Sequence, residues 1–171
     1  MNCLHIYTGD GKGKTTASVG LALRALGCGK KVVFCQFFKN GNSGEVKALQ
    51  TFENLTYLKC DKEFPVVFKM TEEQKKEGKI SFLRLFDEAI SLAEDCDMIV
   101  FDEIISTYNF GFLDKEHVIT ILPKIKEYCE VVVTGRDPAE ELCKIADYIS
   151  NIQCVRHPYD IGMKARRGIE F

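Results

Sequence analysis

Near the N-terminus, a short apolar run leads into a glycine-rich segment and then into a helix-forming run. The apolar run is Cys3 to Tyr7, and the segment Thr8–Thr16 reads Thr-Gly-Asp-Gly-Lys-Gly-Lys-Thr-Thr. A strand, a glycine-rich loop, a Lys-Thr pair and a helix in this order are typical of a phosphate-binding P-loop. Glycines let backbone N–H groups approach a polyphosphate closely, and the start of the helix adds partial positive charge. The segment therefore predicts an α/β fold that binds a nucleotide.

The spacing of this loop is unusual. A standard P-loop has a glycine five residues before the glycine of its Gly-Lys pair, and that position, counted back from Gly13, is Thr8. Gly9 comes one residue later, so the glycine-bounded loop is shorter, and it carries an additional lysine, Lys12. We expect the shorter loop to hold phosphates in an unusual way. The alternative is a glycine-rich turn without a ligand, which the agreement of strand, loop and helix disfavours.

The charge of a nucleotide requires more than the helix terminus. A nucleoside triphosphate carries about four negative charges, whereas a helix terminus supplies about half a positive charge. We therefore expect Lys14 and a metal ion to balance the phosphates, with the hydroxyl of Thr15 offered to Mg²⁺. The residues expected to hold the phosphates are Gly9, Asp10, Gly11, Lys12, Gly13, Lys14, Thr15 and Thr16.

The composition is that of a single globular domain. Of the 171 residues, 46% are hydrophobic and 28% are charged, and the net charge is −2. Lysine and arginine are scattered, which argues against a nucleic-acid surface. No apolar run has the length of a membrane span, and the chain enters its first strand without a signal peptide. The eight cysteines form no Cys-x-x-Cys pair, which favours structural thiols in the reducing cytoplasm over a metal site or disulfides.

Apolar runs alternate with helical patterns along the chain. This alternation predicts a three-layer, RecA-like P-loop fold, with a mostly parallel central sheet flanked by helices. The helix after the loop is apolar nearly all round and is expected to be buried. Ile80–Glu94 predicts an amphipathic helix, Asp114 an N-cap, and Asp137-Pro138 the start of another helix. The predicted strands are Cys3–Tyr7, Val32–Phe37, Leu55–Leu58, Met98–Phe101, Glu130–Val133 and Tyr148–Ile152, and the expected mobile loops are Lys39–Gly44 and Lys59–Lys79.

Polar side chains follow three of these strands. Because ligands bind at the carboxyl ends of strands in open α/β sheets, these side chains are expected beside the P-loop. There, Asp102 and Glu103 are expected to hold Mg²⁺, and Arg136 to contact phosphate. Gln36 and Lys39 reach the same edge. The alternatives are a solvated strand end for the two carboxylates and a surface salt bridge for Arg136.

The sequence offers no clear general base. The three histidines, His5, His117 and His157, lack metal-ligand spacing, and no serine or cysteine nucleophile signature is present. An enzyme whose second substrate is itself a strong nucleophile would not need a base.

These features resemble the P-loop ATP:corrinoid adenosyltransferases, the cob(I)alamin or cob(I)yrinic acid a,c-diamide adenosyltransferase family of vitamin B12 metabolism. The resemblance follows the family's order over nearly the whole chain. The matching segments are Tyr7–Ala17, Gln36–Lys39 with Gly44-Glu45, Phe101–Ile104, Thr134–Arg136, Ala146-Asp147, and a tail with His157-Pro158, Gly162, Lys164-Ala165 and Gly168–Glu170.

The resemblance implies transfer of the 5′-deoxyadenosyl group of ATP to the cobalt of a reduced Co(I) corrinoid, with release of inorganic triphosphate. It implies that ATP binds in reverse, so that C5′ faces the corrinoid, which fits the short loop. Cob(I) is a strong nucleophile, which fits the missing base. By the resemblance, Lys14, Thr15 and Glu103 are catalytic: Lys14 neutralises the leaving triphosphate, while Thr15 and Glu103 serve Mg²⁺ with support from Asp102.

For the corrinoid, the resemblance points to Phe64, which matches an aromatic residue that displaces the lower cobalt ligand in family members. Core packing is the alternative for this side chain. A second aromatic position holds tryptophan in some relatives; this chain has none, and Val66 stands near that place with Phe68 close by. The N-terminal helical extension of better-known relatives is expected to be missing. A homodimer and a flavodoxin-like or other reductase partner are also implied.

Two other functions compete with adenosyl transfer. A conventional P-loop kinase or ATPase explains Lys14, Thr15 and the carboxylates, but not the short loop or the tail. A non-catalytic, RecA-like nucleotide-binding module acting on nucleic acid is disfavoured by the net charge of −2.

Overall fold

The computed structural model describes residues 1–39, 41 and 43–170. Its centre is one sheet of six parallel strands in the order β3-β2-β4-β5-β1-β6. Each strand lies within one residue, at either end, of the strand predicted from the sequence. The strands are β1 (Leu4–Thr8), β2 (Val32–Gln36), β3 (Leu55–Lys59), β4 (Met98–Asp102), β5 (Glu130–Thr134) and β6 (Tyr148–Asn151).

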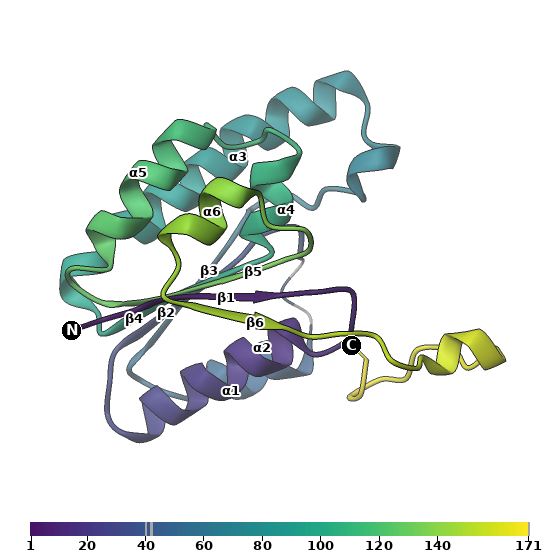
Figure 1. Ribbon diagram of the computed structural model, residues 1–171, viewed down its shortest axis with the longest axis horizontal. Helices are drawn as coiled ribbons and strands as arrows, with labels where there is room; N and C mark the ends of the chain where they lie inside the picture. Colours follow the sequence, from purple (N-terminus) through teal and green to yellow (C-terminus); the bar gives the residue numbers. More distant parts are fainter. Residues whose placement is uncertain (40, 42, 171) are drawn as a thin grey trace.

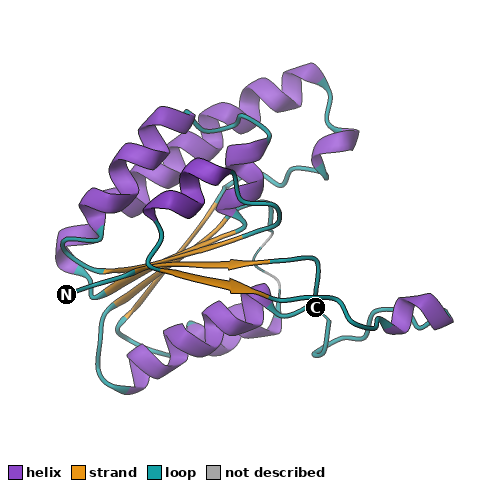
Figure 2. Cartoon of the chain, in the orientation of Figure 1, coloured by secondary structure: helices purple, strands orange, loops and turns teal. Residues whose placement is uncertain are grey.

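Helices cover both faces of the sheet, which confirms the predicted three-layer architecture (Figure 1, Figure 2). On one face lie α1 (Lys14–Gly27) and α2 (Gly44–Leu49). On the other face lie α3 (Glu72–Ser91), α4 (Ile104–Asn109), α5 (Lys115–Ile125) and α6 (Glu140–Ile145). Short 3-10 turns occupy Val67–Lys69, Ala93–Asp95 and Pro158–Ile161. In the described part of the chain, no helix combines the length and the apolarity needed to cross a bilayer.

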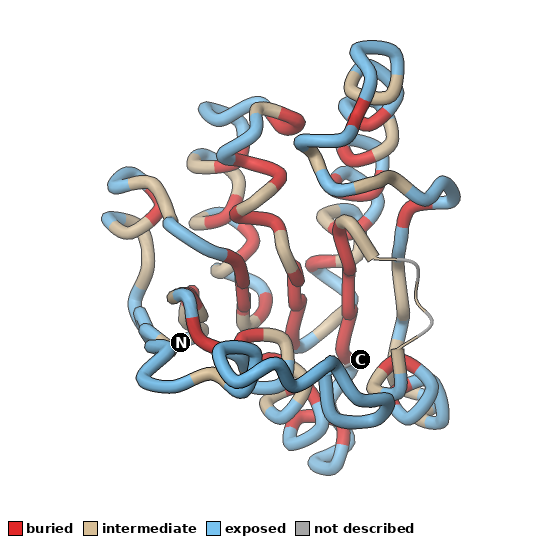
Figure 3. The backbone as a smooth tube through the Cα atoms, turned by 90° about the vertical axis from the view of Figure 1, so that its right-hand side faces the viewer, coloured by how far each residue is buried: buried red, intermediate tan, exposed pale blue. Residues whose placement is uncertain are grey.

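The sheet is buried from both sides at its centre. All five residues of β2 and all five of β4 are buried, which is the pattern of parallel strands covered on both faces. Figure 3 shows these buried strands in the middle of the molecule, surrounded by exposed helix faces and loops. The core on the α3 side is rich in aromatic residues, among them Phe37, Phe82, Phe86 and Phe101. Burying each of these rings contributes about 2 kcal/mol of hydrophobic free energy.

Two helix predictions are wrong. The helix after the P-loop, α1, is buried along one face only, and Leu23 on its outer face is 47% exposed. An outer layer of a three-layer fold has nothing to cover its far side. Helix α3 begins at Glu72, inside the stretch expected to be a loop, because Thr71 and Gln74 form a reciprocal capping box.

Of the two predicted N-caps, one is confirmed. Asp114 accepts a hydrogen bond from the backbone N–H of His117 and caps α5. The start assigned to Asp137-Pro138 is wrong, because α6 begins at Glu140 with Ala139 as its N-cap, and Asp137 adopts a left-handed φ of 51°. Of the loop expected at Lys39–Gly44, residues 40 and 42 lie outside the described residues, and Gly44 is the first residue of α2.

The strand order determines which residues can meet at the carboxyl edge of the sheet. Strand β5 lies between β1, which leads into the P-loop, and β4, which ends at Asp102. Thr134 at the end of β5 is therefore held between Asp102 and the loop. The sequence predicts the RecA-like, mostly parallel class of fold, and the structure adds the order of the strands.

Candidate active site

The first two loop glycines pack closely against the chain that follows β6. Gly9 has a φ of 104°, and a Cβ built there would collide with the carbonyl oxygen of Ile152. A Cβ on Gly11 would lie 2.7 Å from the same oxygen, which already accepts the Gly11 N–H at 2.8 Å. Glycine at these two positions is thus required by protein packing, rather than by the approach of a phosphate.

Gly13 is required for a different reason. Its φ is 125°, a conformation that residues with a side chain rarely adopt, and a Cβ there would meet nothing within 4 Å. Gly13 therefore faces open space at the start of α1, where its backbone lines the cavity described below.

Lys14 folds back over the loop. Its Nζ donates to the carbonyl oxygens of Gly9 (2.7 Å) and Gly11 (2.8 Å), and the residue is only 9% exposed. Burial, together with the nearby charge of Arg136, lowers the pKa of Lys14 from its usual value. The ammonium group is thereby fixed beside the backbone that would surround an anion.

Asp102 is the centre of a buried hydrogen-bond network. Its side chain is fully buried, and its two oxygens accept four hydrogen bonds of 2.8 to 3.0 Å. Four contacts use the acceptor capacity of a carboxylate nearly fully. Oδ1 accepts from Thr15 Oγ1 and Thr134 Oγ1, and Oδ2 accepts from Gln36 Nε2 and Lys39 Nζ.

Gln36 and Lys39 approach Asp102 from the neighbouring strand and its loop. Gln36 is fully buried next to Asp102 in the sheet register, and its amide oxygen accepts from the hydroxyl of Tyr57. Gln36 therefore contacts the Asp102 carboxylate within the protein interior and does not line the cavity beside the loop. Lys39 lies at the front, where its Nζ also donates to Thr15 Oγ1 at 3.0 Å.

Glu103 follows Asp102 and is the N-cap residue of α4, with a left-handed φ of 66°. Its backbone N–H donates to Thr134 Oγ1, and its carboxylate accepts from Ser106 Oγ at 2.8 Å. Glu103 lines two of the cavities described below, whereas Asp102 is fully buried. The carboxylates of Asp102 and Glu103 therefore have different hydrogen-bond partners.

A cavity of about 580 Å³ opens beside the loop, and we call it the phosphate pocket. Arg136 lines it, and so do the tail residues Gly168 to Glu170, which reach it from the far end of the chain. Glu170 forms an ion pair with Lys12 at 3.3 Å. Gly9 and Asp10 do not line this pocket; Asp10 instead accepts the backbone N–H of Cys154. The lining residues are Gly11–Thr16, Val19, Lys39, Gly44, Glu45, Glu103, Arg136 and Gly168–Glu170.

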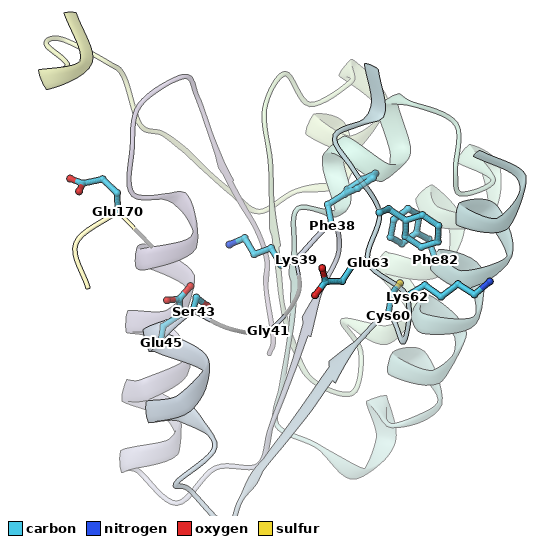
Figure 4. A pocket seen from close by; sticks show the side chains of 11 residues that line it. Phe38, Lys39, Gly41, Ser43, Glu45, Cys60, Lys62, Glu63, Phe82 and Glu170 are labelled. Atoms are coloured by element: carbon cyan, nitrogen blue, oxygen red, sulfur yellow. The ribbon is translucent and has the colours of Figure 1, made fainter. Parts of the chain in front are cut away.

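A second cavity, of about 370 Å³, lies next to it; its lining is mainly apolar and includes four phenylalanines, and we call it the aromatic pocket. Phe64 is half-buried and packs against Phe82 with a centroid distance of 5.3 Å, whereas Phe68 is 88% exposed and lies edge-on to Phe110. An adjoining cavity of about 440 Å³ shares Phe38, Lys39 and Phe64 with it, and Figure 4 shows Phe38 and Lys39 among its lining side chains. The aromatic pocket is lined by Phe38, Lys39, Phe64–Phe68, Glu103, Ser106 and Phe110.

Sequence reasoning did not single out several of these residues. Phe38 stands inside a matched segment, between Gln36 and Lys39, so its position at a strand end was a usable signal. Phe110 and Ser106 lie on or just after α4, a short helix that carries no periodic pattern. Only the folded chain brings them beside Phe64.

The donor set next to the loop suits a magnesium ion. Mg²⁺ prefers hard oxygen ligands, keeps several waters, and is held in nucleotide enzymes by one or two carboxylates plus phosphates. The Thr15 hydroxyl and the Asp102 carboxylate provide such oxygens, 2.9 Å apart. Among the described residues, no cluster of three or more His, Cys, Asp or Glu side chains is arranged to hold a metal ion.

The fold and the loop together define a P-loop nucleotide-binding protein. Solved structures share this architecture at low sequence identity. The flagellar accessory protein FlaH from Methanocaldococcus jannaschii superposes with a TM-score of 0.54 at 19% identity, over 86% of this chain and 69% of that chain. The cytoplasmic domain of EssC gives a TM-score of 0.56 at 14% identity, over 96% of this chain and 34% of that chain. These likenesses concern the fold alone.

Sequence comparison assigns this P-loop protein to one family. The model of the family described as ATP:corrinoid adenosyltransferase BtuR/CobO/CobP matches residues 1–171, so the chain belongs to that family. Relatives named corrinoid adenosyltransferase, from Escherichia coli K12 and Salmonella typhimurium LT2, are each 31% identical over 97% of this chain and 84% of their own length. A third, from Pseudomonas aeruginosa, is 29% identical over 98% of this chain and 83% of its own length. The family resemblance read from the motifs is confirmed.

Proposed function

We propose that this protein transfers the 5′-deoxyadenosyl group of ATP to the cobalt of a reduced corrinoid. Co(I) supplies the electron pair that forms the Co–C5′ bond. The C5′–O bond breaks, and its electrons leave with inorganic triphosphate. The observation that carries this proposal is that the phosphate pocket and the aromatic pocket share a boundary formed by Lys39 and Glu103. A nucleotide whose triphosphate fills the first pocket can present its C5′ atom to a ligand in the second.

The phosphate pocket suits the leaving group. Besides Lys39, which is paired with Asp102, Lys12, Lys14 and Arg136 bring three positive charges to one cavity, and triphosphate gains negative charge as the C5′–O bond breaks. Fixed cations at the position where charge develops lower the barrier, and one such group can contribute about 10²–10³ in rate. Lys14 is held most rigidly of the three, by its two bonds to loop carbonyls.

Mg²⁺ is the metal that we propose for this site. Thr15 and Asp102 would hold it, and Glu103 at the pocket boundary would assist through its carboxylate. The bound ion would neutralise phosphate oxygens. What supports this assignment is the oxygen chemistry of the donors, since the Thr15 hydroxyl and the Asp102 carboxylate lie 2.9 Å apart.

The aromatic pocket suits the flat, largely apolar faces of a corrinoid. Val66 is 62% exposed and Phe68 is 88% exposed, while Phe64 lies deeper. Exposed apolar groups gathered in one place are typical of a ligand or partner surface. We infer that Phe64 contacts the lower face of the corrinoid, and that Val66 and Phe68 cover the area taken by tryptophan in some relatives.

We further propose that the enzyme works in the cytoplasm as a homodimer, with electrons supplied by a flavodoxin-like or other reductase. Family membership supports the dimer and the reductase. The eight cysteines are all free thiols, which supports a reducing compartment. Size-exclusion chromatography with light scattering tests the dimer, and a monomer at micromolar concentration would contradict it.

Product analysis tests the reaction. The protein, ATP, Mg²⁺ and chemically reduced cobalamin are incubated without oxygen, and the products are resolved by chromatography. We expect a light-sensitive Co–C product and inorganic triphosphate in equal amounts. A conventional kinase or ATPase would release ADP, with or without free phosphate, and that product would overturn the proposal.

A further inference from the structure

Asp102 is a carboxylate that needs a cation. Its side chain is completely buried, and a buried charge without a partner is strongly destabilising. Thr15, Thr134 and Gln36 give it neutral hydrogen bonds, but these do not cancel its charge. Within residues 1–39, 41 and 43–170, Lys39 is the one cationic side chain that forms an ion pair with it, at 2.8 Å.

The ammonium of Lys39 occupies the place suited to a divalent cation. Nζ lies 2.8 Å from Asp102 Oδ2 and 3.0 Å from Thr15 Oγ1. These two side chains are also the oxygen donors that suit Mg²⁺. A lysine and a metal ion cannot use the same oxygens in the same place at once. Lys39 is able to leave, since its side chain is 31% exposed and extends from a loop.

Lys39 is joined to the aromatic pocket through the residue before it. Phe38 has a φ of 54°, a left-handed conformation that costs about 1–2 kcal/mol for a residue with a side chain. Its ring packs on Phe82 and Phe112 at centroid distances of 4.5 and 5.6 Å. Figure 4 shows the two neighbours pointing in opposite directions, Phe38 toward Phe82 and Lys39 away from it. Phe38 thus has a strained backbone conformation directly next to the residue that forms the ion pair with Asp102.

We propose that Lys39 takes the place of the divalent cation in the metal-free protein, gives up its bonds to Thr15 and Asp102 when the cation binds, and thereby releases Phe38 to rearrange the aromatic pocket. Lys39 is thus a positioning residue that links metal binding in one pocket to the shape of the other. This inference rests on the proposed Mg²⁺ site. Its tests contain neither ATP nor corrinoid, so their failure is distinct from failure of adenosyl transfer.

Mn²⁺ affinity tests the exchange directly. Binding of Mn²⁺ alone is followed by electron paramagnetic resonance in the wild type, in Lys39→Met and in Lys12→Met. The Lys12 variant is the matched control, because it removes the same charge from the same pocket without touching Thr15 or Asp102. We expect Lys39→Met to bind Mn²⁺ about tenfold more tightly, within the usual range of coupling between sites, and Lys12→Met to change the affinity by less than about twofold. Equal effects of the two variants, or no gain in Lys39→Met, would overturn the exchange.

The wild-type protein provides a second test that does not depend on the folding of a variant. Lysine acetylation by acetic anhydride is measured at each site by peptide mass spectrometry. The rate at Lys39 should rise at least about threefold when Mg²⁺ is raised to saturation, because the amine leaves its two partners. The rate at Lys12 should change by less than about twofold. An unchanged rate at Lys39 with bound metal would overturn the exchange.

A tryptophan reporter tests the link to the aromatic pocket. The chain contains no tryptophan, so Phe68→Trp places a single fluorophore on that pocket. Adding Mg²⁺ should shift the tryptophan emission of the Phe68→Trp protein, which keeps Lys39. It should leave the emission unchanged in the double variant that also carries Lys39→Met. If Mn²⁺ affinity rises in Lys39→Met but the emission never responds to Mg²⁺, the exchange is retained and the role of Phe38 is refuted.

Discussion

The hydroxyl of Thr134 should be one of the most consequential single atoms in the active site. It donates to Asp102 Oδ1 at 2.8 Å and accepts the Glu103 backbone N–H at 2.9 Å, and the residue is fully buried. Thr134→Val keeps the shape of the side chain and removes both bonds. One bond involves a buried charge, and losing it costs about 1.5–3 kcal/mol; the orphaned N–H costs about 1–3 kcal/mol. The methyl group that replaces the hydroxyl contributes about 0.8 kcal/mol of hydrophobic stabilisation, which offsets part of this loss.

The net expectation is a fall of about 2–5 kcal/mol in the free energy of unfolding, or about 4–20 °C in Tm for a chain of this size. Urea denaturation followed by circular dichroism measures it. Thr56→Val is the matched control, because Thr56 is an exposed threonine on edge strand β3, and it should change stability by less than about 0.5 kcal/mol. A Thr134→Val protein as stable as the control would refute the argument that this hydroxyl joins the Asp102 network to α4.

Three further predictions concern the loop and a buried thiol. Lys14→Met should reduce turnover by about 10²-fold or more while circular dichroism stays native, and near-normal turnover in the folded variant would contradict its role. Gly9→Ala should destabilise the protein far more than Gly27→Ala at the end of α1, because only Gly9 combines a φ of 104° with a clash at Ile152; equal thermal stability of the two variants would count against the packing argument. Burial raises the pKa of the Cys60 thiol to about 11, so its reaction with iodoacetamide should accelerate as pH rises from 7 toward 11, and a rate that levels off near pH 9 would be inconsistent with it.

The central strands β2, β4 and β5 could be predicted from the sequence because each contains a short, continuous apolar run, as β4 shows with Met-Ile-Val-Phe before Asp102. The capping box of α3 was missed because Thr71 and Gln74 sit in a Lys- and Glu-rich stretch that reads as a loop. A reciprocal cap is a local signal, so this helix start was available from the sequence.

The active-site residues divide in the same way. Their position at one edge of the sheet follows from where the strands end. Which side chain contacts which depends on the register of the strands. Gln36 pairs with Asp102 across β2 and β4. Its amide is therefore buried next to the carboxylate, whereas Lys39 contacts the same carboxylate from the solvent-accessible side. The need for glycine at positions 9 and 11 comes from Ile152, far along the chain. No local pattern contains that contact.

The orientation of ATP is the most direct test of the central claim. A crystal structure of the protein with ATP and Mg²⁺ in the absence of corrinoid would locate both ends of the nucleotide. The account predicts the triphosphate within hydrogen-bonding distance of Lys14, and C5′ at the Lys39–Glu103 boundary, facing Phe64. A γ-phosphate pointing across that boundary, with the adenosine held away from it, would contradict the account.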